Sequence, residues 1–165
     1  MFFVRTATER DLPQVSALLA EAWHATYYAF YGAARVSEIT AKWHSVEALK
    51  AQLARRDAEF VVADDGKALG GMGYAAMSKS EPGVAVLHQL YVLPQYQRQG
   101  IGRDIFAELE TCFPDAKKMR LEVAPENAQA VGFYTAHGFA KIGETASCGG
   151  EHSGIAAWVL EKALH

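Results

Sequence analysis

The chain has 165 residues, half of them hydrophobic and 21% charged, which is typical of a globular protein and predicts one domain, residues 1–165, with a sizeable core. A net charge of -3 argues against a nucleic-acid partner, and the absence of a long apolar run argues against a membrane span. The N-terminus lacks the basic region, apolar segment and cleavage site of a signal peptide, which predicts a cytoplasmic location.

Hydrophobic periodicity, turn residues and helix caps divide the chain into alternating strands and helices. In chain order, the predicted elements are a strand at 2–6, a helix that begins at 8–11 and has an aromatic-rich end at 23–31, helices at 37–43 and from a Ser45 N-cap to about 55, strands at 59–63, 68–78 and 84–92, a helix at 104–113, a strand at 118–123, a helix at 127–137, and strands at 139–144 and 155–160. This order predicts a mixed α/β sheet with helices available for both faces.

The segment 92–103 joins the end of a strand to the start of a helix and reads Val-Leu-Pro-Gln-Tyr-Gln-Arg-Gln-Gly-Ile-Gly-Arg. Gly100 and Gly102 allow a ligand to approach the backbone N–H groups at the helix start. The helix dipole adds partial positive charge there, and Arg98 and Arg103 add full charges. The segment therefore has the features of a pyrophosphate-binding loop.

Other glycine motifs fit the sequence less well. A dinucleotide-binding fingerprint needs its glycines directly after the strand and a third small residue, whereas five residues separate Pro94 from Gly100 and position 105 is Ile. The Gly-Lys-Ser/Thr of a P-loop is absent. Gly71 and Gly73 lie within a strand pattern and are predicted to mark a close approach to the backbone. An ordinary glycine-bearing loop remains an alternative for 92–103.

A second motif lies at the predicted junction between the strand 118–123 and the helix 127–137. Asn127 begins this helix, and Tyr134 follows seven residues later on the same helical face. Taken singly, Asn127 is typical of a helix N-cap and Tyr134 of an amphipathic core residue.

Together, the two motifs closely resemble those of the GNAT superfamily of N-acetyltransferases, over residues 87–106 and 120–143. The resemblance implies a mixed α/β (α+β) fold, with a mostly antiparallel sheet of six to seven strands, splayed at the cofactor site, and helices on both faces. It implies acetyl-CoA as cosubstrate, no metal, and acetyl transfer to a primary amine of a small molecule, peptide or protein by direct attack in a ternary complex. The alternative is a non-catalytic acetyl-CoA-binding sensor or regulatory module.

The resemblance also assigns roles to individual residues. Backbone groups of Leu90 and Val92 would hold the acetyl and pantetheine portion, and Asn127 would contact the pantetheine arm. Tyr134 would act as general acid on the departing thiolate, since a tyrosine remains protonated at neutral pH. The backbone amides that would surround the pyrophosphate are those of Gln97, Arg98, Gln99, Gly100, Ile101, Gly102 and Arg103.

The sequence departs from the family at the general base. Relatives often carry a Glu on the strand that enters the loop, but residues 84–87 read Val-Ala-Val-Leu. His88 is the titratable residue of this stretch and shares a strand face with Leu90 and Val92, which makes it a candidate base. The alternative is a histidine that forms a hydrogen bond in the core or shapes the pocket.

The acceptor side is predicted less specifically. In relatives, the segment matching 23–31 forms part of the acceptor-site wall, and the candidate residues here are Trp23, Tyr27, Tyr28 and Tyr31, whose rings suit a cationic amine. Internal packing or a contact in a homodimer is the alternative. The loop 145–154 is a candidate opposite wall or lid, and Cys148 within it a candidate thiol. Cys112 is expected to be a buried small residue.

Overall fold

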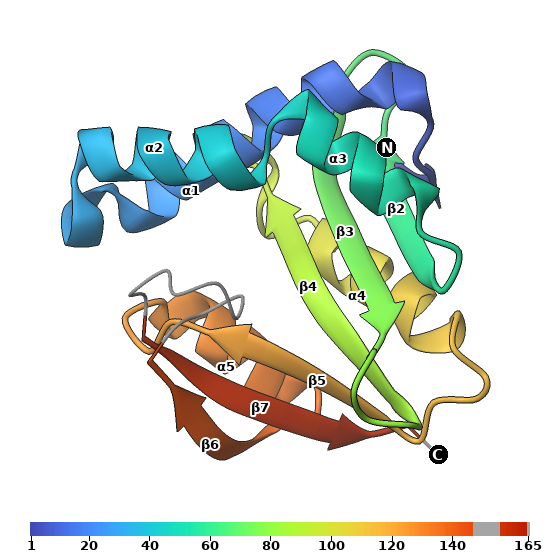
Figure 1. Cartoon of the computed structure of the whole chain (residues 1–165). Helices are drawn as coiled ribbons and strands as arrows, with labels where there is room; N and C mark the ends of the chain where they lie inside the picture. Colours follow the sequence, from blue (N-terminus) through green and yellow to red (C-terminus); the bar gives the residue numbers. More distant parts are fainter. Residues whose placement is uncertain (147–155, 165) are drawn as a thin grey trace. The chain divides into compact units, whose positions relative to one another are not determined.

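The computed structural model describes residues 1–146 and 156–164. Seven strands form a sheet with the order β1-β2-β3-β4-β5-β7-β6 (Figure 1). The elements are β1 (Phe3–Thr6), the short 3₁₀ turn η1 (Glu9–Asp11), α1 (Leu12–Tyr31), α2 (Ala33–Trp43), α3 (Val46–Ala54), β2 (Ala58–Asp64), β3 (Leu69–Met77), β4 (Val84–Val92), η2 (Pro94–Tyr96), α4 (Ile101–Thr111), β5 (Lys118–Val123), α5 (Ala128–Ala136), β6 (Ala140–Thr145) and β7 (Ala157–Ala163). The expected mixed α/β fold is confirmed, with β4 and β5 as a parallel pair in an otherwise mostly antiparallel sheet.

The helix boundaries show where the local sequence signals were sufficient. Ser45 caps α3 as predicted, because its Oγ accepts a hydrogen bond from the Ala48 N–H at 3.1 Å. By contrast, α2 begins at Ala33 instead of residue 37, and α4 begins at Ile101 instead of residue 104. Within the described ranges, none of the helices combines the length and apolar character that a membrane span requires.

The chain divides into two compact units. The first unit comprises residues 1–76 and 89–112, and the second comprises residues 77–88 and 113–165. Strand β4 contributes to both, with its residues up to His88 in the second unit and those from Gln89 onward in the first.

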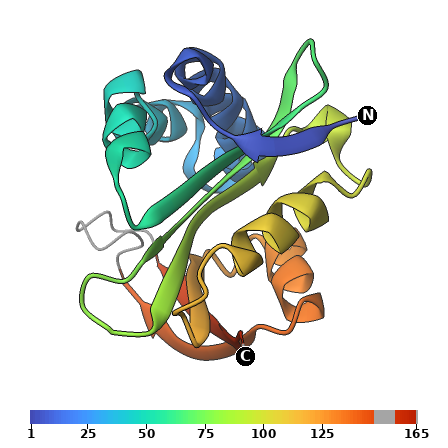
Figure 2. The same ribbon diagram turned by 90° about the vertical axis from the view of Figure 1, so that its right-hand side faces the viewer.

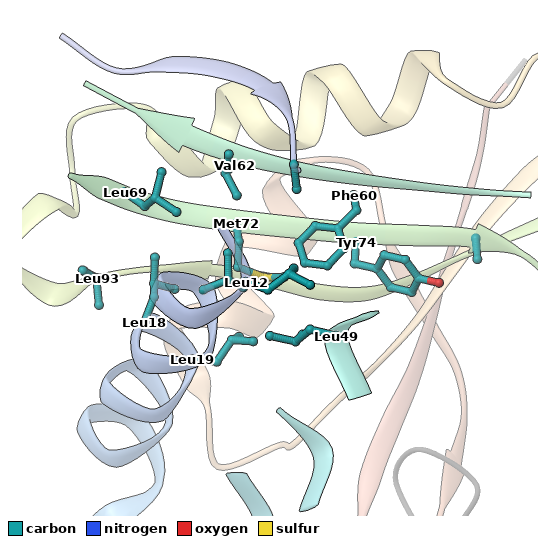
Figure 3. Close-up of a cluster of buried hydrophobic side chains, with 13 residues drawn as sticks. Leu12, Leu18, Leu19, Leu49, Phe60, Val62, Leu69, Met72, Tyr74 and Leu93 are labelled. Carbon is teal, nitrogen blue, oxygen red and sulfur yellow. The ribbon is translucent and has the colours of Figure 1, made fainter. Parts of the chain in front are cut away.

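In the first unit, α1 and α3 cover one face of the sheet. Side chains alternate between the two faces along a strand, so Phe60 and Val62 of β2 point to the same side as Met72 and Tyr74 of β3. These residues pack against leucines of α1 and α3 (Figure 3). The buried cluster consists of Ala7, Leu12, Val15, Leu18, Leu19, Leu49, Phe60, Val62, Leu69, Met72, Tyr74, Ala76 and Leu93.

The opposite face of the same strands is covered by α4. The helix buries Ile101, Ile105, Phe106 and Leu109 along one side. Its side chains lie directly over Gly71 and Gly73 of β3, and the predicted close approach at these two glycines is thereby confirmed, whereas Gly70 meets the ring of Phe2. Helices therefore lie on both faces of this part of the sheet, and α4 packs directly on β3.

In the second unit, β5 lies between two neighbouring strands. It pairs in parallel with β4 from Val84↔Lys118 to Leu87↔Leu121, and it pairs antiparallel with β7 along its whole length. Strand β7 pairs in turn with β6. Helix α5 connects β5 to β6, so the predicted strand-to-helix junction at Asn127 is present as expected.

Candidate functional site

The loop between β4 and α4 belongs wholly to the first unit and is fixed at its start. The Leu93 N–H donates to the Gly70 carbonyl oxygen at 2.9 Å, and the Tyr96 N–H donates to the Leu93 carbonyl oxygen at 2.9 Å. The Tyr96 ring packs edge-on against Phe2, with centroids 4.9 Å apart. These contacts place the residues that follow, Gln97 to Gly100, at the N-terminal end of α4.

The start of α4 exposes backbone N–H groups. Its first internal hydrogen bond runs from the Asp104 N–H to the Gly100 carbonyl oxygen at 3.0 Å, so helix geometry provides no internal acceptor for the N–H groups of residues 101–103. Gly100 is the N-cap, and no described side chain caps the helix in its place. Together with the helix dipole, this arrangement suits an anion such as a pyrophosphate.

The conformation of the loop depends on two residues with positive φ. Gly100 has φ of 84° and Arg98 has φ of 65°, a left-handed conformation that is uncommon for a residue with a side chain. The Arg98 side chain is exposed. Arg103 is 72% exposed and lies 3.7 Å from the carboxylate of Asp104, an acidic neighbour directly after the motif that partly offsets its charge.

The direction of the β4 backbone is consistent with the roles expected for Leu90 and Val92. The Leu93 N–H points to Gly70 of β3, and successive residues of an antiparallel strand direct their polar groups to opposite sides. Leu90 and Val92 therefore direct their backbone groups away from β3, to the β4 edge of the first unit. The Val92 carbonyl oxygen accepts a hydrogen bond from Gln97 Nε2 at 3.1 Å, a link that the sequence did not predict.

In the second unit, α5 carries both residues of the downstream motif. The Asn127 Oδ1 accepts a hydrogen bond from the Ala130 N–H at 3.2 Å, so the N-cap interpretation of Asn127 is confirmed. Tyr134 is buried, with 8% of its surface exposed, and its ring lies edge-on to Phe133 and Phe139 at centroid distances of 5.4 and 5.6 Å. The Tyr134 ring is therefore held in one orientation by two aromatic neighbours.

His88 is exposed on β4, at the last position of that strand in the second unit. Its exposure excludes the interpretation as a core histidine, because such a side chain would be removed from solvent. A solvent-accessible imidazole can exchange protons with water, so the role as a general base stays a prediction that the structure permits.

The aromatic end of α1 packs against the end of α2. Trp23 and Tyr27 are 5% and 6% exposed, and their ring centroids lie 4.4 Å apart. Trp43 lies edge-on to Trp23 at 5.8 Å, and His44 lies 5.7 Å from Trp23. The sequence did not predict that Trp43 and His44 pack against Trp23, although an adjacent Trp-His pair at the end of a predicted helix could have indicated it. Trp23, Tyr27 and His44 are buried and Trp43 is half-buried, so the rings at the ends of α1 and α2 form a largely buried aromatic cluster.

The remaining candidates for the acceptor wall lie farther along α1. Tyr31 stacks on Tyr27 at 5.7 Å and is half-buried, whereas Tyr28 is 60% exposed. The four candidates therefore do not share one exposed surface: Trp23 and Tyr27 are buried in the first unit, and Tyr28 and Tyr31 reach solvent.

The structure tests the prediction for Cys112 but not the one for Cys148. Cys112 is only half-buried, so the expectation of a buried small residue is wrong. Its Sγ lies 3.1 Å from the Glu108 carbonyl oxygen. Burial nevertheless raises the pKa of the Cys112 thiol to about 11, which makes it a poor nucleophile at neutral pH. Cys148 and most of the loop 145–154 lie outside the described residues.

Comparisons with known proteins identify the family. The family model for the acetyltransferase (GNAT) domain matches residues 27–155. The structure is similar to PaiA N-acetyltransferase from Thermoplasma acidophilum in complex with coenzyme A, with 22% identity over 99% of each chain and a TM-score of 0.84. It is also similar to a GNAT-family acetyltransferase from Staphylococcus aureus (10% identity over 100% of each chain, TM-score 0.77) and to an acetyltransferase from Thermus thermophilus (16% identity over 99% of this chain and 97% of the other, TM-score 0.72).

At these identities the structural similarities show the shared fold, and none of the curated proteins matches the sequence. The family model, however, spans most of the chain and includes both motifs. The protein therefore belongs to the GNAT family of acetyltransferases.

Proposed function

We propose that this protein transfers the acetyl group of acetyl-CoA to a primary amine of a small molecule, peptide or protein, by direct attack in a ternary complex. The observation that carries the proposal is the N-terminus of α4, where a glycine N-cap leaves the N–H groups of residues 101–103 without an internal acceptor. Membership of the GNAT family and the coenzyme A bound by the Thermoplasma relative support the same assignment.

The first unit supplies the groups proposed to bind the cofactor. Residues 97–103 surround the pyrophosphate, and the N–H groups of residues 101–103 combine accessible donors with the positive end of the helix dipole. The Gln97 N–H already donates to the Pro94 carbonyl oxygen at 3.3 Å, so Gln97 contributes through its side chain. Backbone groups of Leu90 and Val92 bind the pantetheine portion from the β4 edge. The bound cofactor supplies an activated acetyl group, which an amine can attack without a metal ion.

The second unit supplies the proposed proton transfers and a further contact. Asn127 contacts the pantetheine arm as well as capping α5. Tyr134 donates its hydroxyl proton to the sulfur as the carbon–sulfur bond breaks. Its buried ring is held by edge-on contacts with Phe133 and Phe139, which provide the fixed orientation that general-acid catalysis needs. His88 accepts the proton that the amine loses on forming the new amide bond, directly or through a water molecule.

For the acceptor, the exposures favour the outer part of α1. Tyr28 and Tyr31 present ring surface that a cationic amine can contact, whereas the rings of Trp23 and Tyr27 are occupied by neighbours from the same unit. We therefore assign amine binding to Tyr28 and Tyr31 and a supporting role to Trp23 and Tyr27.

The general-acid role is tested by Tyr134→Phe, with release of free CoA thiol measured over a panel of amines. The variant should lose about 100-fold in kcat and keep the wild-type affinity for CoA, because the ring packing is retained and only the proton donor is lost. Thr135→Ala removes a hydroxyl from the same helix and should leave kcat unchanged. Equal rates for Tyr134→Phe and wild type on a true acceptor would show that Tyr134 is not the acid.

The base role is tested by His88→Ala. Loss of a proton acceptor should lower kcat by about 10- to 100-fold near neutral pH and remove the acidic limb of the pH–rate profile. Full activity of His88→Ala at every pH would eliminate this assignment.

The absence of the family's usual Glu before His88 favours a second candidate function, a module that binds acetyl-CoA without turnover. Tight CoA binding combined with no thiol release over the whole amine panel would establish that alternative.

A further inference from the structure

Gly71 and Gly73 of β3 lie directly beneath α4, the helix whose N-terminus carries the proposed pyrophosphate site. In Figure 2, α4 (yellow) lies on the face of the first unit's strands opposite to α1 (blue). Gly71 and Gly73 are two positions apart on β3, so both face the same side of the sheet, and both meet side chains of α4.

Gly71 lies under the first turn of α4 and beside β4. A β-carbon at this position would lie 2.8 Å from the Tyr91 carbonyl oxygen, 3.1 Å from Ile105 Cδ1 and 3.2 Å from Ile101 Cγ2. The Tyr91 oxygen belongs to the backbone of β4 and cannot rotate away, so β4 has to shift relative to β3 to accept a methyl group. The two isoleucine contacts would at the same time push α4 outward by a few tenths of an ångström. Ile101 directly follows the Gly100 N-cap, and a displacement at this turn therefore reaches the loop.

Gly73 lies under the next two turns of the helix. A β-carbon there would lie 2.5 Å from Ile105 Cγ2 and 2.8 Å from Leu109 Cδ1, both closer than nonbonded carbon atoms approach one another. Ile105 and Leu109 have no exposed surface. A branched Ile side chain in a packed interior has little freedom to rotate, so the helix itself has to move outward.

We infer that Gly71 and Gly73 are positioning residues for the cofactor: their missing side chains set the height of α4 over β3, and with it the place of the N–H groups of residues 101–103. This inference rests on the proposed function, because it assumes that these groups bind the CoA pyrophosphate. It goes beyond that proposal by assigning a role to two residues of β3 that lie outside the loop and to which the proposal gives no cofactor contact.

Gly73→Ala tests the inference, with Gly143→Ala as the matched control. Gly143 is also a strand glycine, but a β-carbon there meets no atom within 4 Å. The dissociation constant is measured for CoA and for pantetheine, which lacks the pyrophosphate, alongside urea unfolding. In Gly73→Ala the constant for CoA should rise about 10-fold or more, because small misplacements of binding groups are costly, while that for pantetheine changes little.

Ile105→Ala provides the rescue. It removes the Cγ2 atom that a β-carbon at residue 73 would meet, so Gly73→Ala/Ile105→Ala should bind CoA as tightly as Ile105→Ala alone. This comparison also holds if Gly73→Ala alone fails to fold, because the double variant removes the closer of the two contacts. The remaining contact, with Leu109 Cδ1 at 2.8 Å, involves the end of a flexible side chain that can turn into the space vacated by Ile105. A folded double variant that binds CoA more than about 10-fold more weakly than Ile105→Ala would contradict the inference.

The two proposals fail in different ways. Wild-type protein that does not bind CoA would contradict the proposed function and this inference with it. Wild-type protein that binds CoA, together with a Gly73→Ala variant that is less stable but binds CoA equally well, would overturn only the inference, because the glycine would then serve stability alone.

Discussion

Asp11 is a carboxylate of the first unit with several hydrogen-bond donors around it. Its two oxygens accept hydrogen bonds from Arg5 at 2.9 and 2.8 Å, and one of them also accepts from the Thr8 N–H at 2.7 Å. The Arg5 hydrogen bonds are the main cause that lowers the pKa of Asp11 to about 2, against the opposing effect of burial. Arg5 also donates to Asp64 of β2, so the network joins β1, η1 and β2.

We expect this carboxylate to make folding pH-dependent at low pH. Because the folded pKa of Asp11 is about 2 and its ordinary value is 3.8, its stabilisation is present above pH 4 and is lost as the pH falls from about 4 to 2. The loss should be about 2 kcal/mol. In urea unfolding, the stability difference between wild type and Asp11→Asn should shrink over this range. A difference that stays constant would show that the network contributes no charge-dependent stability.

His44 has the opposite character, a buried titratable group held neutral. It is 3% exposed, and among the described residues its Nδ1 atom has no hydrogen-bond partner. Burial lowers the pKa of His44 to about 4. Its backbone oxygen accepts a hydrogen bond from Ser16 Oγ at 2.6 Å, which anchors the end of α2 to α1 independently of the ring.

His44 should therefore make the protein sensitive to mild acid. The unfolded chain takes up the proton below about pH 6.5 and the folded protein only near pH 4, so stability is lost as the pH falls through this window, by about 3 kcal/mol in total. His44→Phe keeps an aromatic ring and the backbone acceptor, and its unfolding free energy should be less dependent on pH between 6.5 and 4. An identical slope in the two proteins would rule out His44 as the source.

At the scale of elements, an ion network joins three segments of the second unit. Arg120 on β5 donates to both oxygens of Glu81, in the connection between β3 and β4, at 2.8 and 2.9 Å. It also donates to Glu161 on β7 at 3.0 and 2.8 Å. Glu161 is 15% exposed and Glu81 is 52% exposed, so most of the stabilisation should come from the pair with Glu161.

Arg120→Ala is expected to lower the free energy of unfolding by about 2 kcal/mol, because it removes charge-assisted hydrogen bonds from a half-buried carboxylate. Glu81→Gln should have little effect, because that carboxylate faces solvent. Urea unfolding of both variants provides the measurement. A larger loss for Glu81→Gln than for Arg120→Ala would reverse this assignment of the network.

At the scale of the whole molecule, cofactor binding should stabilise the fold. A ligand that binds only the folded state adds about 2.7 kcal/mol when its concentration is 100 times its dissociation constant. CoA should therefore raise the melting temperature in proportion to the logarithm of its concentration, whereas NAD at equal concentration should not. A shift with NAD as large as that with CoA would indicate that the glycine loop accepts pyrophosphates without selecting CoA.

The fold class and the motifs could be predicted from the sequence because each depends on residues that are close together in the chain. The Gly100 loop, the Asn127 cap, the Ser45 cap and the apolar runs of β2 and β3 depend on neighbours within a few residues. The family could also be inferred from the sequence, because the loop 92–103 and the Asn127/Tyr134 motif occur together and in the order typical of the family. The start of α4 was placed three residues late because glycine is a poor helix former, whereas in the structure Gly102 lies within the first turn.

Only the tertiary structure decided which residues meet across the chain. It buried Trp23 against Trp43 and His44, and it exposed His88, outcomes that depend on contacts between distant segments. The sequence by itself indicated that the backbone comes close to something at Gly71 and Gly73; the structure showed that α4 lies there. The reason is physical: a glycine in the sequence indicates that a side chain is missing at that position, but the segment that packs there is determined by contacts between distant parts of the chain.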